Sequence, residues 1–381
     1  MPRLTAPPQA PVGGYGILGT GSYLPPVVVP NGPVAAAAGV TDEWIVRKTG
    51  IRERRHARPD QAASDLAAHA ATAALATAGI DPGAVGLVLV ATSTPDHPQP
   101  ATANLVQHLI GADRAAAFDL NAVCSGFVYA LEVARTLLPG LGPTPYALVI
   151  GVDVYSRILD PTDRRTAVLF GDGAGAVLLG PTPDGPGLHP AILRGVGAEH
   201  RLIGVQAGGS RLPASARTVA DGSHHFRMDG RAVRAFVAEE LPALVHDTLA
   251  AHRLPAPDLD HFIPHQANGV MLDELAPRLG LRPDTLRRTV THYGNTGAAS
   301  IPLTLDATFR ADLLAPGHHL LLAAFGGGMN LAATLCTWTG PRHGPAIDRP
   351  AANGRPEEGN RQNSAPATGE PRPSTASASA P

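Results

Sequence analysis

The sequence predicts an α/β protein, and three features of its 381 residues lead to this prediction. Between about Val12 and Gly340, short aliphatic runs alternate with Ala-rich stretches of helical composition, and Gly or Pro stands at the joins. Hydrophobic residues make up 44% of the chain and aromatic ones only 4%, so the core must consist of Ala, Val, Leu and Ile side chains. Several aliphatic runs are unbroken, which is typical of strands that helices cover on both faces.

Composition also limits the classes of function. A net charge of -2 provides no basic field to attract a nucleic acid. The first dozen residues lack the apolar core of a signal peptide, and no segment approaches the roughly 20 apolar residues of a membrane span. Two cysteines argue against a disulfide scaffold. We therefore expect a soluble, cytoplasmic protein that binds neither nucleic acid nor membrane.

The N-terminal half, predicted over 12–182, contains the first group of strands. Apolar runs predict strands at 85–92, 115–120 and 146–154, and two further strands around a glycine turn within 167–180. The turn sequence GDGAGA is similar to a dinucleotide-binding fingerprint, but no helix follows it. We interpret it as a structural turn.

The C-terminal half, predicted over 228–340, repeats this pattern. A long amphipathic helix over 228–254 precedes predicted strands at 259–266, 318–328 and 329–338. The similarity predicts an internal duplication, with one parallel sheet from each half. Residues 183–227 are rich in Gly and Pro and predict an inserted excursion, and the Pro-, Ala- and Ser-rich tail over 341–381 predicts disorder.

Cys124 is the candidate nucleophile. It follows the predicted strand at 115–120 and stands at the start of a segment of helical composition. The positive end of a helix dipole lowers the thiol pKa from its ordinary value of about 8.5 and favours the thiolate. The alternative is a small buried hydrophobic residue, which is how we interpret Cys336, inside a strand-like segment.

Two polar residues at the ends of apolar runs are candidate partners of the thiol. His265 stands just past a predicted strand, and Asn295 lies on a tight loop that opens a helix near Ala298. The alternatives are a core histidine and an ordinary turn or N-cap asparagine. Three consecutive glycines at 326–328 could expose backbone N–H groups to an oxyanion, although a β-bulge explains them equally well.

Taken together, these segments resemble the β-ketoacyl-[acyl carrier protein] synthase III family of the thiolase superfamily. The resemblance implies a thiolase-like fold, in which two duplicated βαβαβαββ halves form an αβαβα layered sandwich. It covers nearly the whole of 12–340. The segments that carry it are TDEWIVRKTGIRERR (41–55), DLNAVCSGFVYALE (119–132), LDPTDRRTAVLFGDGAGAVLLG (159–180), MDGRAVRAF (228–236), IPHQAN (263–268), HYGNTGAASIPL (292–303) and FGGGMN (325–330).

The resemblance also implies a mechanism. Cys124 attacks an acyl-CoA starter, and the backbone N–H groups of Cys124 and Gly327 hold the oxyanion. Malonyl-acyl carrier protein then decarboxylates, and His265 Nε2 and the Asn295 amide donate to the enolate oxygen. Attack of the enolate on the acyl group yields a β-ketoacyl thioester that initiates fatty acid or polyketide chains. The reaction requires no metal or redox cofactor.

Other members of the superfamily are similar in fewer respects. Elongating ketosynthases use two histidines besides the cysteine. In this chain the third catalytic candidate, after Cys124 and His265, is Asn295. Biosynthetic thiolases need a second catalytic cysteine, and Cys336 lies in a strand on the wrong side of the glycine loop. Hydroxymethylglutaryl-CoA synthases add a glutamate with no convincing counterpart here, and chalcone-type synthases surround the three residues differently.

The same resemblance implies the binding residues. They are Trp44, Lys48 and Arg164 for CoA, Gln99, Phe170 and Phe325 for the acyl pocket, and Arg231, Arg234 and Arg278 for docking of the carrier protein. Lys48 replaces a common arginine, and Gly297 stands where serine is usual. Gln99 replaces a phenylalanine that reaches across a homodimer into the partner's acyl pocket, and Val270 replaces a docking arginine. These departures indicate a starter other than acetyl and a specialised pathway.

Two further hypotheses remain open from the sequence. A non-condensing acyltransferase would move the acyl group from Cys124 to a hydroxyl or amine of a small molecule. A catalytically silent partner subunit would not acylate Cys124 at all.

Overall fold

The first sheet has five strands and forms the core of the N-terminal half. The computed structural model describes residues 14–182, 185 and 187–341, so the predicted tail beyond Pro341 lies outside the described residues. The strand order is β1-β7-β6-β4-β5. The strands predicted at 85–92, 115–120 and 146–154 are confirmed, but the predicted parallel sheet is mixed because β7 runs antiparallel to both its neighbours. The strands are β1 (Tyr15–Tyr23), β4 (Val85–Ala91), β5 (Ala116–Leu120), β6 (Tyr146–Asp153) and β7 (Gly173–Pro181).

The second sheet has four strands in the order β11-β12-β13-β8. β11 and β12 are parallel, and β13 runs antiparallel to both its neighbours. Beyond β11, Phe262 forms an isolated parallel bridge with Leu286. The strands are β8 (Ile192–Gly195), β11 (His261–Pro264), β12 (His319–Gly326) and β13 (Asn330–Thr337).

Strand order confirms the internal duplication. We number the strands of each half along the chain and count Leu286 as the third strand of the second half. Read from β1 in the first sheet and from β8 in the second, both sheets then have the order 1-5-4-2-3. The parallel and antiparallel pairs also correspond. β8 lies within the predicted excursion 183–227, so that prediction is wrong for this strand. Its alternating half-buried pattern is short, which explains why the sequence carries little signal for it.

One of the two strands predicted within 167–180 is absent. Residues 167–169 form turns, and Phe170 makes an isolated parallel bridge with Asn295 of the other half. A Cβ on Gly171 would overlap the carbonyl oxygen of Tyr293, so the backbones of the two halves approach each other closely here. This contact, and not a sheet, accounts for the apolar run and the glycine.

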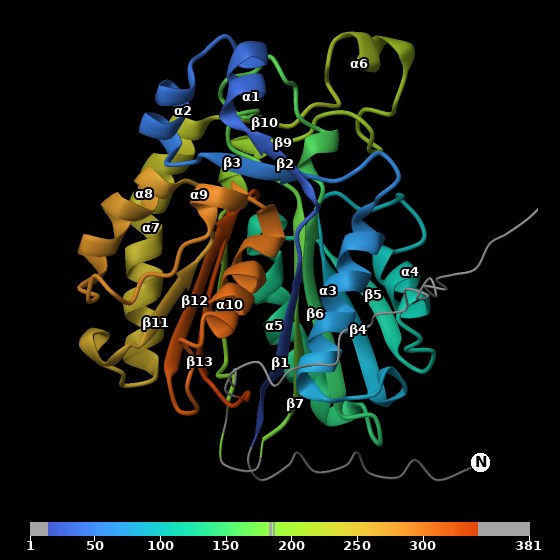
Figure 1. The fold of residues 1–381 in the computed structure, drawn as a ribbon, viewed down its shortest axis with the longest axis vertical. Coiled ribbons are helices and arrows are strands. Elements are labelled where there is room, and N and C mark those ends of the chain that lie inside the picture. Colours follow the sequence, from blue (N-terminus) through green and yellow to red (C-terminus); the bar gives the residue numbers. More distant parts are fainter. Residues whose placement is uncertain (1–13, 183–184, 186, 342–381) are drawn as a thin grey trace, which may run out of the picture. The chain divides into compact units, whose positions relative to one another are not determined.

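Helices form three layers around the two sheets (Figure 1). α3 (Ala63–Ala78) and α4 (Thr102–Leu109) pack on the outer face of the first sheet. α5 (Gly126–Leu137) and α10 (Ser300–Arg310) lie between the sheets. α7 (Gly230–Ala251) and α8 (Gly269–Leu275) cover the outer face of the second sheet. The αβαβα sandwich is therefore confirmed.

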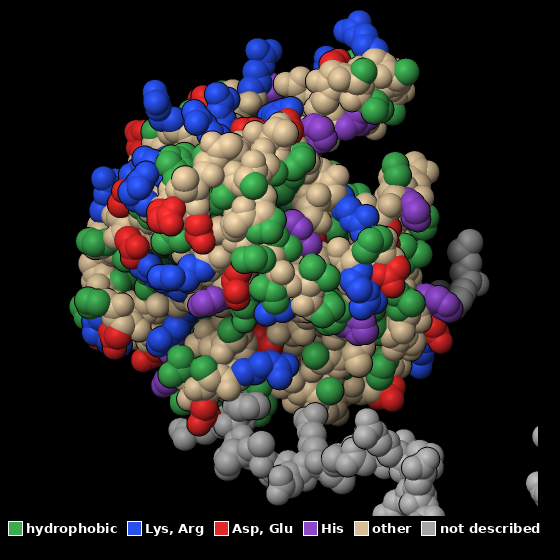
Figure 2. All heavy atoms as spheres, turned by 45° about the horizontal axis from the view of Figure 1, so that its top comes forward, with side chains coloured by type: hydrophobic (Ala, Val, Ile, Leu, Met, Phe, Trp, Pro, Cys, Tyr) green, Lys and Arg blue, Asp and Glu red, His purple; other side chains and the backbone are tan. Residues whose placement is uncertain are grey.

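Smaller elements lie at one edge of these layers, where α1 and α2 are labelled in Figure 1. Figure 2 turns this edge toward the viewer and shows Lys and Arg side chains intermixed with Asp and Glu. No helix of the described residues is both long and apolar enough to cross a membrane. The smaller elements are α1 (Asn31–Ala38), α2 (Asp42–Thr49), α6 (Ala216–Ala220), α9 (Val290–Tyr293), β2 (Val27–Pro30), β3 (Glu53–His56), β9 (Ile203–Gly204) and β10 (Arg227–Met228).

Candidate active site

The two central helices, α5 and α10, begin beside each other. A short 3-10 turn over Val123–Ser125 precedes α5 and contains Cys124, and a second over Gly297–Ala299 precedes α10 just after Asn295. A Cβ on Gly126 would lie 3.9 Å from the Cβ of Ala298, so the two helix starts are in contact. The duplication thus places the cysteine and the asparagine near corresponding helix starts of the two halves.

Contacts through neighbouring residues bring His265 to the same place. His265 directly follows β11, and its ring packs edge-on against Phe325 at 5.0 Å between centroids. The next residue, Gly326, lies so close to the cysteine that a Cβ there would be 2.7 Å from the backbone nitrogen of Cys124. On the other side, Tyr155 lies near enough to the Cys124 thiol to lower its pKa. The three predicted residues therefore converge on one site.

The Cys124 thiol is buried, and this decides its charge. The side chain is 7% exposed, and burial raises its pKa, with the carboxylate of Asp153 acting in the same direction. The nearby Tyr155 hydroxyl lowers the pKa by less than burial raises it. The prediction of a lowered pKa at the helix start is therefore wrong for the empty site, because desolvation outweighs the helix dipole. Cys336 lies in the core as predicted, and burial raises its pKa to about 12.

His265 is a neutral hydrogen-bond donor. It is 2% exposed, and burial lowers its pKa to about 3. Its Nδ1 lies 2.7 Å from Ser300 Oγ, which also accepts the N–H of Gln266 at 3.3 Å. When the Ser300 O–H donates to Nδ1, the ring proton lies on Nε2. This tautomer is the one that the predicted enolate contact requires.

The Asn295 side chain is oriented by its own loop. Its Oδ1 accepts the N–H of Gly297 at 2.9 Å, and its backbone pairs with Leu169 and Gly171. Gly297 has a φ of +58°, and a Cβ there would overlap a carboxylate oxygen of Asp153. Glycine is therefore required at 297, which explains the departure from serine. With Oδ1 occupied, Nδ2 is the donor that remains for a ligand.

We expect Ser300→Ala to slow condensation by about 10- to 100-fold and to leave acylation of Cys124 nearly unchanged. The variant removes the hydroxyl that holds the proton of His265 on Nε2. Separate measurement of acyl-enzyme formation and of product formation checks this expectation.

Thr308→Ala is the matched control for Ser300→Ala, because Thr308 is a buried hydroxyl of the same helix that bonds only a helix carbonyl. Equal losses of condensation in the two variants would contradict an orienting role for Ser300.

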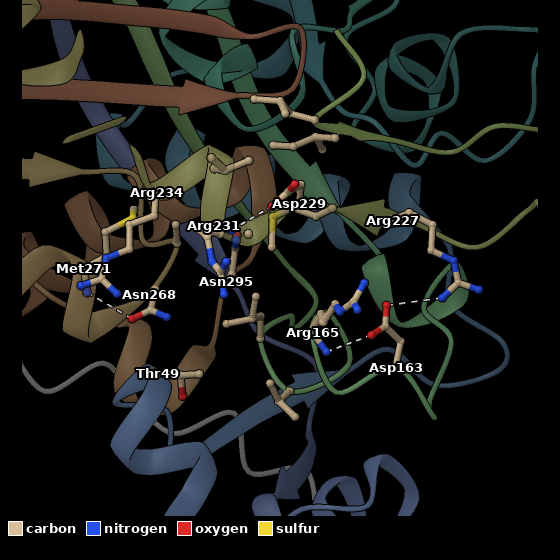
Figure 3. A pocket seen from close by; sticks show the side chains of 18 of the residues that line it. Thr49, Asp163, Arg165, Arg227, Asp229, Arg231, Arg234, Asn268, Met271 and Asn295 are labelled. Carbon is tan, nitrogen blue, oxygen red and sulfur yellow. Dashed lines mark hydrogen bonds and ion pairs between the residues drawn. The ribbon is translucent and has the colours of Figure 1, made fainter. Parts of the chain in front are cut away.

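A cavity of about 1230 Å³ reaches Asn295 at the edge of this site, and neither Cys124 nor His265 is among its lining residues (Figure 3). Asn295 and Phe325 line it, as do the three residues predicted for CoA, Trp44, Lys48 and Arg164. Figure 3 shows that cationic side chains from separate elements surround it, among them Arg165, Arg227, Arg231 and Arg234. The cavity can therefore take an anionic ligand with an extended arm that reaches Asn295.

Other predicted binding residues lie away from this cavity. Phe170 is buried behind Tyr155, with ring centroids 4.3 Å apart, and does not line the cavity. Gln99 is exposed on the loop before α4, and its role depends on a second chain, so it stays a prediction. Arg278 lines a separate hollow of about 130 Å³ and donates to the carbonyl of Ala238.

Sequence reasoning missed three residues that touch the predicted ones. They are Asp153, Tyr155 and Ser300. Asp153 is the last residue of the buried strand β6, so the criterion that selected His265, a polar residue at the end of an apolar strand, could have found it. Ser300 and Tyr155 carry no such signal, because their relevance depends on contacts between distant segments.

This fold and site define a thiolase-fold condensing enzyme with a Cys-His-Asn arrangement. Two family models match the chain: 3-oxoacyl-[acyl-carrier-protein (ACP)] synthase III at residues 118–194, and the C-terminal part of the same family at 249–338. The chain belongs to this family and is a β-ketoacyl-[acyl carrier protein] synthase III-type acyltransferase.

Individual relatives match over nearly their whole length. The acetoacetyl CoA synthase NphT7 of Streptomyces sp. (strain CL190) is 55% identical over 85% of this chain and 98% of the relative. The β-ketoacyl-[acyl-carrier-protein] synthase III of Symbiobacterium thermophilum is 41% identical over the same shares. Among solved structures, the priming β-ketosynthase of the R1128 polyketide pathway matches with a TM-score of 0.80 and 33% identity, over 88% of this chain and 98% of that one.

Proposed function

We propose that the chain loads an acyl-CoA starter on Cys124 and condenses it with a malonyl thioester to give a β-ketoacyl thioester. In the first step the Cys124 sulfur bonds the acyl carbon, and CoA leaves as the thiol. In the second, the malonyl carboxylate leaves as carbon dioxide, and its electron pair forms an enolate. The enolate carbon attacks the acyl group, and Cys124 is released. We propose that a homodimer carries out these steps, as the resemblance implies.

The observation that carries this proposal is the pair of neutral donors beside the thiol. Burial lowers the pKa of His265 to about 3, so the ring is neutral and donates from Nε2 when Nδ1 accepts the Ser300 O–H. The Asn295 Oδ1 accepts the N–H of Gly297, and its Nδ2 is a second donor. Neither group is a base that could activate a hydroxyl or amine acceptor. Two neutral donors stabilise an oxyanion that exists only after decarboxylation, which favours condensation over simple acyl transfer.

The test follows the carboxyl carbon of the extender. Protein loaded with acyl-CoA is mixed with malonyl thioester labelled in its free carboxyl group, and released carbon dioxide is measured against product. Equal amounts of both support the proposal. A stable acyl-enzyme that transfers its acyl group to a small molecule without carbon dioxide release would overturn it. Intact-mass analysis after exposure to a mixture of acyl-CoAs identifies the starter.

The charges near the predicted docking face bear on the carrier of the malonyl group. Arg234 is ion-paired with Glu274, and Arg288 with Asp273. These acidic partners reduce the attraction for an acidic carrier protein. We therefore propose that malonyl-CoA is used more efficiently than malonyl-carrier protein. The printed name of the 55% identical relative, an acetoacetyl CoA synthase, supports this choice.

Glu274→Gln is expected to raise kcat/KM for malonyl-carrier protein by about threefold to tenfold at low salt, because it frees Arg234. The value for malonyl-CoA should change by less than twofold. Glu239→Gln, an exposed glutamate on α7 and outside the cavity lining, is the matched control. No gain for the carrier substrate, or an equal gain in the control, would contradict the proposal.

A further inference from the structure

Gln266 is a fully buried amide two residues after β11, and the mechanism described so far does not use it. It is 0% exposed and is not among the residues that line the cavity. Its Nε2 donates to the carbonyl of Pro264 at 2.8 Å and to that of Arg287 at 3.2 Å. Its Oε1 accepts the N–H groups of Thr289 at 2.9 Å and Val290 at 3.3 Å. Backbone groups therefore occupy all four hydrogen-bonding positions of this amide.

The amide nitrogen of Gln266 holds the backbone around His265. Pro264 and Gln266 flank this histidine, so the bond from Nε2 to the Pro264 carbonyl closes a turn around it. The backbone N–H of Gln266 also donates to Ser300 Oγ, which lies 2.7 Å from His265 Nδ1. These bonds fix the backbone from which the His265 ring projects.

The amide oxygen of Gln266 holds the segment that leads to Asn295. It accepts two N–H groups at the start of α9, a helix whose N-cap residue Thr289 has no side-chain bond to its first turn. The N–H of Gly294 bonds the carbonyl of Val290 across this short helix. Asn295 is the next residue, so a displacement of the start of α9 is transmitted to the Asn295 amide.

The start of α9 is also connected to α10. Thr289 Oγ1 lies 2.7 Å from Thr304 Oγ1, and the Thr304 hydroxyl donates to the carbonyl of Ser300. Hydrogen bonds therefore lead from Gln266 through α9 and α10 and back to Ser300 beside His265. Gln266 is the member of this ring that contacts the backbone next to His265 and the start of α9 at once.

We propose that Gln266 is a positioning residue that sets the separation between His265 Nε2 and Asn295 Nδ2, the two donors to the enolate oxygen. This inference rests on the proposed function, in which the two donors act together. One oxygen can accept both hydrogen bonds only when each donor lies about 2.7–3.1 Å away. A shift of about 1 Å at either donor is enough to cost on the order of 100-fold in rate. Acylation of Cys124 is assigned to backbone N–H groups and should not depend on this separation.

Gln266→Glu tests the two donated hydrogen bonds and keeps the acceptor for Thr289 and Val290. An ionised carboxylate would place an oxygen against the carbonyls of Pro264 and Arg287 and repel them. The protonated acid would instead donate to one of these carbonyls, as the amide does. Burial and the two carbonyls disfavour the charged form, so the pKa of the introduced carboxyl should lie above the ordinary glutamate value of about 4.3.

The charged side chains of the segments around this amide have other partners. Arg287 Nε donates to His261 Nδ1 at 2.9 Å, and Arg288 is ion-paired with Asp273. Burial keeps His265 neutral, with a pKa of about 3. Neither arginine is therefore free to hold the introduced carboxyl in its charged form.

The test measures acyl-enzyme formation and condensation separately, between about pH 5.5 and 8.5, with the malonyl thioester that the wild type condenses. At pH 8, Gln266→Glu should lower kcat for condensation by about 30- to 100-fold. The KM for the malonyl thioester and the acylation rate should change by less than about threefold, because Gln266 lines no part of the cavity. The ratio of variant to wild-type kcat should rise as the pH decreases, since the acid form restores a donor. A loss of stability alone would lower acylation and condensation together.

Gln266→Leu removes all four bonds and introduces no titrating group. It should condense at least as slowly as Gln266→Glu at pH 8, retain acylation and show no recovery at lower pH.

Gln61→Glu is the matched control, because Gln61 is a buried glutamine of the N-terminal half. Its amide donates to Tyr23 Oη at 2.9 Å and accepts the N–H of Arg58 at 3.2 Å. The substitution changes the same atoms away from the two donors, so both half-reactions should keep their wild-type rates and pH dependence.

Wild-type condensation in both Gln266 variants, or equal losses of acylation and condensation in either, would overturn the inference and leave the proposed function standing. The same selective loss in Gln61→Glu would also overturn it. Wild-type protein that forms the acyl-enzyme but releases no carbon dioxide from a malonyl thioester would overturn the proposed function, and this inference with it.

Discussion

Cys124→Ala is expected to form no acyl-enzyme and to lose at least about 10⁴-fold in condensation. The substitution removes the sulfur that Tyr155 contacts and that lies between the two helix starts. No other described nucleophile replaces it, since the second cysteine is fully buried in β13. Intact-mass spectrometry after incubation with acyl-CoA measures the loss directly, because each acyl group adds a defined mass.

Cys336→Ala is the matched control for this loss. It removes a buried thiol from the core between the sheets, so we expect some loss of thermal stability and normal acylation. An acyl group that remains attached to the Cys124→Ala protein and is absent from the Cys336→Ala protein would show that the nucleophile has been assigned to the wrong cysteine.

Asn295→Ala is expected to acylate normally and to condense about 10²- to 10³-fold more slowly, which is the second largest effect. The amide Nδ2 is one of two donors available to the enolate oxygen, whereas the acyl oxyanion of the first step is assigned to backbone N–H groups. Single-turnover measurements that follow acyl-enzyme and carbon dioxide separately distinguish the two steps.

Asn295→Asp tests whether the donor or the shape of the side chain matters. Aspartate can still accept the N–H of Gly297, so the loop before α10 should keep its conformation. It replaces the donor with a negative charge next to the developing enolate, and condensation should fall at least as far as in Asn295→Ala. Unimpaired condensation by either variant would remove Asn295 from the enolate site.

Local patterns in the sequence were sufficient to predict most of the buried strands. β4, β6 and β12 are nearly continuous aliphatic runs, and any chain that folds must bury them. β8 was not predicted, because the sequence pattern of a four-residue edge strand with alternating exposure differs little from that of a loop. A strand was wrongly predicted before Gly171 for the opposite reason, since its apolar residues are buried in a cluster of side chains from both halves and not in a sheet.

The candidate site divides in the same way. Cys124, His265 and Asn295 each stand at the end of a predicted element, and the order of elements along the chain places such ends at one edge of the fold. Asp153, Tyr155 and Ser300 enter the site through contacts between segments that are far apart in the sequence. A single sequence contains no information on such pairs.

The sequence by itself determined the fold class and the duplication, because strand and helix patterns are local properties, and its resemblance to a family singled out the three residues predicted for catalysis. Only the tertiary structure decided the charge and orientation of those residues. Burial leaves Cys124 as a thiol, and Ser300 Oγ lies 2.7 Å from Nδ1 of His265 and orients its ring. Protonation depends on desolvation and on hydrogen bonds from distant segments, and these exist only after the two halves have packed together.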